Sequence, residues 1–256
     1  MVTLETSKEV LFLLKDAPFT KFTLLTTKFL PLPPKIILLE LPAKEILSLS
    51  QTKTLPILKS SDIFFTGTFP IIKYLLHSSQ DISDGITLDN KVILLGSNPK
   101  EESKVDMWLN FIFYQMCPII EEIEAELYGK KMFDIRQFEY ALNDLLEILV
   151  DVNHYLELRP FLTANHVQLC DVLLTSVLFN CYKDVFTQNE LDLFPNVIRV
   201  FQFVANMRLF KNVFGKAIPC KKVKRHEPFI EKKKEENKEK DNNNENKKKK
   251  KNKEKK

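Results

Sequence analysis

The sequence predicts an α/β layer, then an all-helical domain, then a disordered basic tail. Three observations support this order: short apolar runs broken by proline near the start, a 3.6-residue apolar period from Glu101 onward, and a closing stretch of lysine, asparagine and glutamate. Hydrophobic residues make up 44% of the 256 residues, enough for the cores of one or two modest domains. The expected boundaries are an α/β domain at 1–80, a linker at 81–100, a helical domain at 101–220 and the tail at 221–256.

Four short apolar runs in the first domain have the length and composition of β-strands. They cover residues 10–14, 35–41, 55–59 and 63–65. A helix is expected at 19–30, where phenylalanines recur on one face, and the prolines from Pro31 onward end it. A strand is expected to end at Leu55-Pro56, and an apolar helix follows Gly67. A strand, a helix, a strand, a hairpin and a helix together form a compact α/β layer.

Four stretches of the second domain have helical periodicity. They cover residues 101–127, 133–157, 166–186 and 194–215. Pro118 should kink or split the first stretch, because proline lacks an amide hydrogen and crowds the preceding turn. The third stretch is nearly all apolar, so it should form the most buried helix. The last stretch should form two short helices that stop at Gly215.

The cysteine and histidine content argues against a zinc site and against a disulfide framework. Cys117, Cys170, Cys181 and Cys220 have no Cys-x-x-Cys spacing, and the chain has 4 histidines. The N-terminus lacks the apolar core of a signal peptide, and no stretch approaches the roughly 18 apolar residues of a membrane-spanning helix. We therefore expect no metal, no membrane contact and a reducing, cytoplasmic location.

Charge is distributed unevenly along the chain. Residues 216–256 contain 18 lysines and arginines against 8 aspartates and glutamates, a net charge of +10, so the rest of the chain carries −6 of the total of +4. The tail has no apolar residue after Ile230 and cannot form a packed core, so we expect it to be disordered. Two interpretations stay open: an electrostatic contact with RNA, the ribosome or an acidic protein, and a solubilising linker.

The segment around Leu55-Pro56 resembles the glutathione S-transferase family, whose first domain is thioredoxin-like. In that family a residue followed by a cis-proline presents its backbone to the cysteinyl group of glutathione, and Leu55-Pro56 matches this pair. The family's helix entrance has an acidic or amide residue, a hydroxyl residue and then Ile-x-x-Tyr-Leu, which corresponds to GTFPIIKYL at 67–75. The resemblance implies a glutathione S-transferase fold and a glutathione site at Leu55, Pro56 and Thr68.

The same region departs from the family where ligand binding and catalysis depend on side chains. Gly67 stands where the family holds the γ-glutamyl amine, a loss of ~1.5–3 kcal/mol of binding. Active transferases place a tyrosine, serine or cysteine after the first strand, whereas this chain offers only Thr20 near the right place, and Lys15 is expected to be solvated. The resemblance thus implies a vestigial site, weak or no glutathione binding, no other cofactor and no catalytic residue.

A second match lies in the helical domain. The residues FLTANHVQLCD at 161–171 resemble the family's segment at the start of a buried helix, with Asp171 in place of its buried aspartate. In the family a serine or threonine caps this helix and the aspartate closes a capping box. Gln168 holds the cap position and is a poor cap, so Asn165 with Gln168 is an alternative box one turn earlier. We expect a structural role for Asp171, because buried carboxylates are paired.

Residues 193–222 resemble the end of the N-terminal domain in the elongation factor 1 gamma family. The matching residues are Phe194-Pro195-Asn196-Val197, Asn206, Phe210-Lys211, Val213, Gly215 and Cys220. The segment 102–111 around Trp108 also resembles a helix of that family. The family continues after a charged linker into a second domain, so this chain is expected to be a shortened protein or a part of a longer one.

This resemblance implies a non-catalytic scaffold in protein biosynthesis. Such a scaffold holds the guanine-nucleotide-exchange subunits, of alpha or beta type, of the elongation factor 1 complex; the chain has no P-loop of its own. Self-association would bury the helix of Trp108 against a second copy, whereas the alternative places Trp108 in the core of one chain. Two other functions stay open: a glutathione S-transferase of weak activity, and an appendage of a tRNA-synthetase complex.

Overall fold

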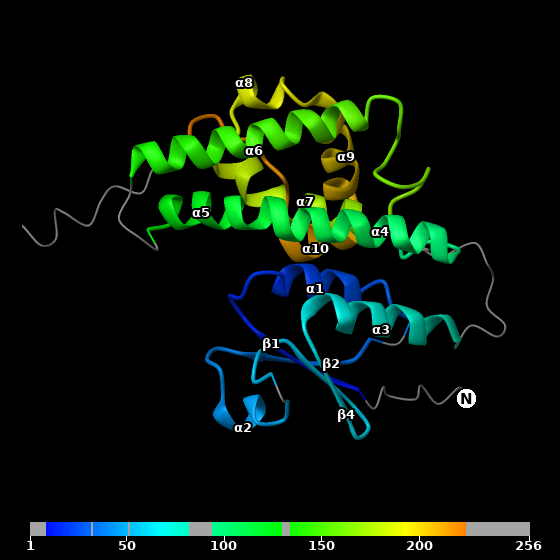
Figure 1. The fold of residues 1–256 in the computed structure, drawn as a ribbon. Helices are drawn as coiled ribbons and strands as arrows, with labels where there is room; N and C mark the ends of the chain where they lie inside the picture. The colour runs from blue at the N-terminus through cyan, green and yellow to red at the C-terminus, as the bar shows by residue number, and fades with distance from the viewer. Residues whose placement is uncertain (1–8, 32, 51, 82–93, 130–133, 224–256) are drawn as a thin grey trace, which may run out of the picture.

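A computed structural model describes residues 9–31, 33–50, 52–81, 94–129 and 134–223 of the chain. The lysine-rich stretch from residue 224 onward, which holds most of the predicted tail, lies outside the described residues. The described part has two layers, a small α/β domain and a larger helical domain that lie against each other (Figure 1). This order confirms the fold class predicted from the apolar patterns.

A four-stranded sheet in the order β2-β1-β3-β4 forms the base of the first domain. Its strands are β1 (Val10–Leu14), β2 (Lys35–Leu39), β3 (Ile57–Ser60) and β4 (Ile63–Thr66). β2 runs parallel to β1, whereas β3 and β4 run antiparallel to their neighbours. The prediction that a strand ends at Leu55-Pro56 was wrong: the pair leads into β3, because proline has no amide hydrogen for the ladder.

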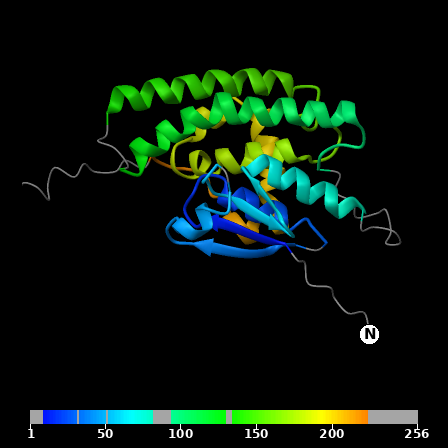
Figure 2. The same cartoon turned by 60° about the horizontal axis from the view of Figure 1, so that its bottom comes forward.

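Two helices cover one face of the sheet and separate it from the helical domain (Figure 1). They are α1 (Thr20–Thr27) and α3 (Thr68–Asp81), and the core between them and the sheet includes Leu11, Leu13 and Leu58. A four-residue helix that the sequence did not predict, α2 (Lys44–Leu47), lies at one end of the sheet (Figure 2). It buries none of its residues, so it contributes little to the core.

The helical domain is built from seven α-helices and one π-helical turn among the described residues. They are α4 (Pro99–Phe111), η2 (Ile112–Met116), α5 (Cys117–Leu127), α6 (Ile135–Tyr155), α7 (Leu169–Asp184), α8 (Gln188–Leu191), α9 (Pro195–Asn206) and α10 (Arg208–Phe214). The predicted break at Pro118 is confirmed, since the wider π-helical turn relieves the clash of the proline ring with the preceding turn. The predicted helix stop at Gly215 is confirmed as well, with the residue at φ 86°.

The predicted most buried helix, α7, lies at the centre of this domain. It contacts α4, α5 and α9, and also α1 of the first domain. Four of its sixteen residues escape full burial, which fits its lack of a polar stripe. No helix among the described residues is both long and apolar enough to cross a bilayer.

The last described residues of the linker are fixed against the start of α7. Leu94 and Leu95 are buried, and the Leu169 amide donates to the Leu94 carbonyl at 2.9 Å. Gly96 then turns with φ +99° into α4, whose first amides are capped by the Asn98 side chain. The linker therefore joins the core of the helical domain at Leu94 and Leu95, and residues 96–98 lead from there into α4.

Candidate functional site

A cleft of about 440 Å³ lies between the two domains and brings the predicted site residues together. Leu55, Pro56 and Thr68 all line it, and so does Gly67. The Leu55-Pro56 peptide bond is cis, as the resemblance implied. The cleft is therefore built where the sequence placed the vestigial glutathione site.

Two turns hold these residues in place. Leu55-Pro56 enters β3, while Gly67 links β4 to the first turn of α3. Gly67 has φ +87°, a left-handed conformation that glycine adopts without a steric penalty from a Cβ atom. Thr68, as the first residue of α3, faces the cleft from the helix end.

The polar side chains that the sequence offered for catalysis are engaged elsewhere. The Thr20 hydroxyl lines the cleft but donates to the Leu14 carbonyl at 2.7 Å, and Thr20 is 5% exposed. The Lys15 ammonium group lies 2.8 Å from the Glu40 carboxylate, with both side chains more than half exposed. Neither group is directed at a reacting atom in the cleft.

Aromatic side chains fill the wall of the cleft, which sequence reasoning missed. The rings of Phe19, Phe69 and Phe113 pack against one another, with centroid separations of 6.2 Å, 5.5 Å and 5.3 Å. They come from the loop after β1, the first turn of α3 and the π-helical turn, so no sequence spacing links them. Such clusters favour apolar ligands or none.

Charge is almost absent from this cleft. Among the described residues that line it, Glu121 is the one charged side chain, and the rest are apolar or small. A carboxylate at this place repels an anionic ligand, and glutathione carries more carboxylates than ammonium groups. Glu121 is therefore a charge that an anionic ligand would meet in this cleft.

A second hollow of about 550 Å³ continues the cleft toward α5 and α7. It shares Phe19 and Glu121 with the first and adds Cys117 and Glu124. Burial, together with the charges of Glu121 and Glu124, raises the pKa of the Cys117 thiol to about 12. Cys117 is therefore protonated at neutral pH and is a poor nucleophile. Within the described part of the chain, no cluster of three metal-binding side chains occurs.

The buried carboxylate of Asp171 holds the start of α7. It accepts hydrogen bonds from the amides of Leu162 (3.0 Å) and Gln168 (2.9 Å), and Gln168 is itself the N-cap in a capping box. The alternative box from Asn165 is therefore wrong, because the extended backbone that precedes the helix falls at Gln168. Burial raises the pKa of Asp171 to about 6, although the two backbone hydrogen bonds act in the opposite direction.

Trp108 lies in the core of the single chain. Its side chain packs against Phe111 and Tyr155 with ring centroids 5.4 Å and 4.9 Å away, and the residue is 8% exposed. No second copy is needed to bury it, which supports the intramolecular alternative.

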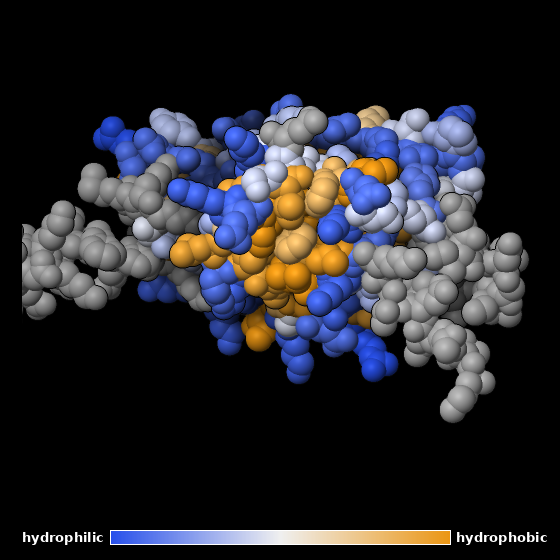
Figure 3. Space-filling model, turned by 90° about the horizontal axis from the view of Figure 1, so that it is seen from below, coloured by the Kyte–Doolittle hydropathy of each residue, from blue (hydrophilic) through white to orange (hydrophobic). Residues whose placement is uncertain are grey.

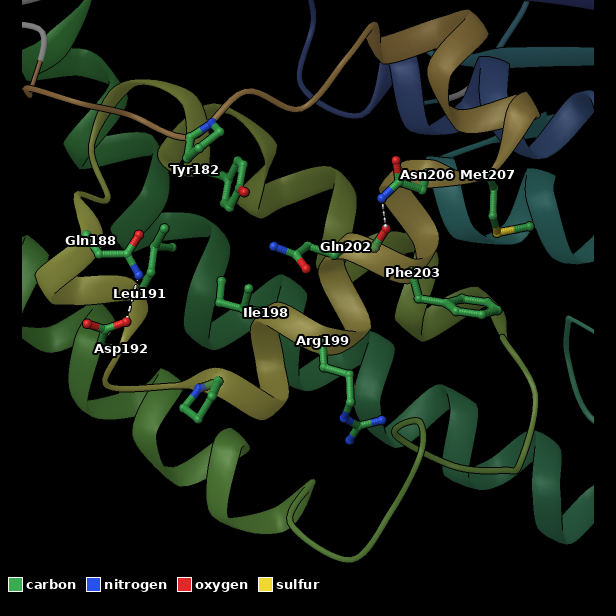
Figure 4. Close-up of a pocket in the computed structure, with 12 residues that line it drawn as sticks. Tyr182, Gln188, Leu191, Asp192, Ile198, Arg199, Gln202, Phe203, Asn206 and Met207 are labelled. Carbon is green, nitrogen blue, oxygen red and sulfur yellow. Dashed lines mark hydrogen bonds between the residues drawn. The ribbon is translucent and has the colours of Figure 1, made fainter.

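A third hollow, of about 840 Å³, lies beside α9 (Figure 4). Its polar groups mostly bond within their own elements: the Gln188 amide donates to the Asp192 carboxylate at 2.7 Å. The Arg199 guanidinium turns away to the carbonyls of Pro160 and Arg159, each at 2.8 Å. These groups do not converge on a point, so the hollow lacks the arrangement of a catalytic site.

Known structures share this architecture. The glutathione S-transferase-like domain of elongation factor 1-gamma from Saccharomyces cerevisiae superimposes with a TM-score of 0.69 at 17% identity, covering 87% of this chain and 99% of that domain. Glutathione S-transferase-I bound with lactoylglutathione gives a TM-score of 0.68 at 16% identity, covering 80% of this chain and 98% of that one. The chain has the glutathione S-transferase fold. Its thioredoxin-like sheet and helical domain both follow that fold.

Comparison of amino-acid sequences relates part of the chain to named proteins. Elongation factor 1-gamma of Danio rerio is 27% identical over 168 residues, 62% of this chain and 37% of that protein. Valine--tRNA ligase of Takifugu rubripes is 26% identical over 126 residues, 49% of this chain and 10% of that protein. No model of a known protein family matches the chain. The domain is thus related to the glutathione S-transferase-like domain of elongation factor 1-gamma, and the chain spans well under half the length of the elongation factor.

Proposed function

We propose that this chain is a non-catalytic scaffold that holds guanine-nucleotide-exchange subunits, of alpha or beta type, of the elongation factor 1 complex in the cytoplasm. The observation that carries the proposal is a glutathione S-transferase fold related to elongation factor 1-gamma, with a cleft in which Glu121 is the one charged side chain among the described residues. Binding through a protein surface needs the fold but no reactive group in the cleft. The bonded Thr20 hydroxyl and the protonated Cys117 thiol agree with this role.

The proposal is tested by reconstitution with purified proteins. The full chain is mixed with purified exchange subunits of the same organism, and the mixture is separated by size-exclusion chromatography. In parallel, the chain is applied to glutathione-agarose and assayed with chlorodinitrobenzene, with an active glutathione S-transferase as the positive control. We expect a stable complex with the exchange subunits, no retention on glutathione and no conjugation above background.

A weakly active glutathione S-transferase is the first competing function. The solved transferases of this fold favour it, and Thr20 is the residue that would carry the activity. Conjugation that disappears in a Thr20→Ala variant, together with retention on glutathione, would overturn the scaffold proposal. Because the Thr20 hydroxyl bonds to its own backbone neighbour, we expect the variant and the parent chain to give the same background rate.

The valine--tRNA ligase match favours a second competing function, an appendage of a tRNA-synthetase complex. The same reconstitution separates the two scaffolds when a purified synthetase is offered beside the exchange subunits. Preference for the synthetase would reject the elongation factor complex while retaining a scaffold function.

Contact of the basic tail with RNA or the ribosome is tested by removing residues 224–256 and measuring ribosome co-sedimentation.

A further inference from the structure

The face of the sheet that points away from α1 and α3 is mainly apolar. The strand register places ten side chains there in three rows: Lys35, Val10, Lys59 and Phe64; Ile37, Phe12, Ile57 and Thr66; and Leu39 with Leu14. Burial along β1 supports this assignment, because Leu11 and Leu13 are buried in the core while their neighbours are partly exposed. These ten positions are called the outer face below.

The outer face breaks the usual pattern of a sheet with one solvated side. Such a sheet alternates apolar and polar residues, whereas seven of these ten positions are valine, isoleucine, leucine or phenylalanine. Six of the seven are partly exposed and Ile57 alone is buried. Figure 3 views this side of the molecule and shows a continuous hydrophobic area bordered by hydrophilic residues. Exposed apolar areas of this kind mark interaction surfaces.

The fold covers this area only in part. In Figure 2 the strands lie in front of the helices, and α2 lies at the end of the sheet. Ile57 in the middle row is fully buried, and Ile46 and Leu47 of α2 are half-buried, so the accessible part of the outer face lies over the other six apolar positions, which stay partly exposed. The apolar side chains of the face also lie outside the main core cluster, which extends from the opposite side of the sheet. The main core therefore does not use these side chains, and they can contact another protein.

Positive charge is concentrated at one end of the outer face. Lys35 and Lys59 lie in one row on either side of Val10, and both are exposed. Within the described residues, neither ammonium group has an ion pair or a side-chain hydrogen bond. The nearby Glu9 carboxylate accepts a hydrogen bond from Ser60, whose side chain also contacts Tyr74 of α3 on the opposite side of the sheet. The two lysines are therefore available to carboxylates of a partner.

The opposite end of the face has no comparable excess of charge. Lys15 follows Leu14 and pairs with Glu40, which follows Leu39, at 2.8 Å. The outer face therefore has an apolar middle, a positive end and a charge-balanced end. Such an asymmetry fixes the direction in which a charged segment binds.

We infer that the outer face binds an amphipathic, acidic segment of another protein. Its apolar side chains contact Phe12, Ile37 and Phe64, and its carboxylates pair with Lys35 and Lys59. The inference rests on the proposed function, in which this segment belongs to an exchange subunit. An apolar centre with charges at the rim is the usual anatomy of a protein–protein interface.

The test compares two charge reversals in the full chain. Lys35→Glu with Lys59→Glu alters the outer face, while Lys104→Glu with Lys211→Glu makes the same change in net charge at two exposed positions of the helical domain. Each protein is titrated with a purified exchange subunit at low and at high salt. We expect the first variant to bind about tenfold more weakly at low salt and to lose the salt dependence, and the control to bind like the parent.

A Phe64→Ser variant tests the apolar part of the face. Phe64 lies on the edge strand and is partly exposed, so its replacement should lower the midpoint of thermal unfolding only slightly. We expect binding to weaken about fivefold with the salt dependence intact, because an apolar contact is lost and no charge is altered.

Each outcome of these titrations decides a separate point. Equal binding by the parent, the outer-face variants and the control overturns the inference and leaves the proposed function standing. No binding by the parent chain overturns both. If sedimentation shows that the chain alone is a dimer and that the Lys35→Glu, Lys59→Glu variant is a monomer, a second copy occupies the face, and the inference is wrong.

Discussion

The start of α7 and the cleft beside Leu55-Pro56 both lie where the glutathione S-transferase resemblance places its motifs, yet their polar groups differ. At α7 the Asp171 carboxylate accepts two backbone hydrogen bonds and completes a capping box. In the cleft the backbone geometry is present, with a cis bond and a left-handed Gly67, but the wall is mostly apolar. The hydrogen bonds that stabilise the start of α7 are thus all present, whereas the cleft has few polar groups that could bind a ligand.

The two places differ in what happens to the hydrogen-bond partners when a polar side chain is lost. Removing Asp171 would leave two amides without an acceptor in a buried place, which costs free energy on folding. A cleft that opens to solvent carries no such penalty, because water satisfies whatever remains there. A cleft without ligand-binding side chains therefore costs the fold no stability, whereas removal of the α7 cap does.

Replacement of Asp171 by alanine should have the largest effect on stability. We expect the free energy of unfolding to fall by about 4 kcal/mol, because the amides of Leu162 and Gln168 lose their acceptor. Urea unfolding followed by circular dichroism measures the change. Asp144→Ala, at an exposed position of α6, is the matched control and should change the value by less than about 0.5 kcal/mol. Equal effects would refute the structural role.

The pH dependence of stability gives the next largest effect. Burial raises the pKa of Asp171 to about 6 from 3.8, so the folded chain binds its proton more tightly than the unfolded chain does. The protonated Asp171 side chain stabilises the fold fully below the pKa that it has in the unfolded chain. This stabilisation is lost as the pH rises through about 6, and the free energy of unfolding falls by roughly 3 kcal/mol. An Asp171→Asn variant should lack this decline when its unfolding curves are compared with those of the parent between these two pH values. Parallel pH profiles would contradict the assignment.

Gly96 and Gly215 lie in turns that differ in how closely other atoms approach them. A Cβ atom at Gly96 would lie 2.7 Å from the Glu101 Cβ and 3.0 Å from the Glu102 amide nitrogen, whereas at Gly215 it would meet nothing within 4 Å. Both residues have positive φ, so both substitutions carry the backbone penalty of about 1 kcal/mol. We expect Gly96→Ala to cost about 2 kcal/mol or more and Gly215→Ala about 1 kcal/mol in urea unfolding. Equal costs would show that the turn before α4 can shift.

The smallest expected effect concerns the contact between the domains. The Lys73 ammonium group of α3 lies 2.7 Å from Asp106 and 3.2 Å from Glu102 of α4. Burial lowers the pKa of Lys73, but the hydrogen bonds to Asp106 and Glu102 outweigh it and the pKa is raised. We expect Lys73→Met to lower the free energy of unfolding by about 1 kcal/mol, since the pair is partly exposed. A salt titration that removes the difference would support the electrostatic origin.

Much of the fold could be predicted from apolar periodicity alone. β1 was predicted at its observed bounds, and the helix break at Pro118 and the stop at Gly215 follow from local backbone chemistry. The short α2 was missed because four residues give no measurable period. The strand end at Leu55-Pro56 was wrong because the strand begins after the proline.

The candidate site was predictable only in its backbone. Leu55, Pro56 and Thr68 meet in one cleft, as the resemblance implied. The Phe19, Phe69 and Phe113 rings that fill its wall come from three distant segments, and only the folded chain brings them together. The outer face was hidden for the same reason, because strand pairing decides which alternate residues share a side.

The hydrogen bond between Leu169 and Leu94 has a mechanical consequence. Tension applied to the chain through the first domain reaches Leu94 before it reaches the first turn of α4. There it is resisted by a backbone hydrogen bond and by two leucines seated beside the most buried helix. The start of α7 thus anchors the chain segment that leads into α4.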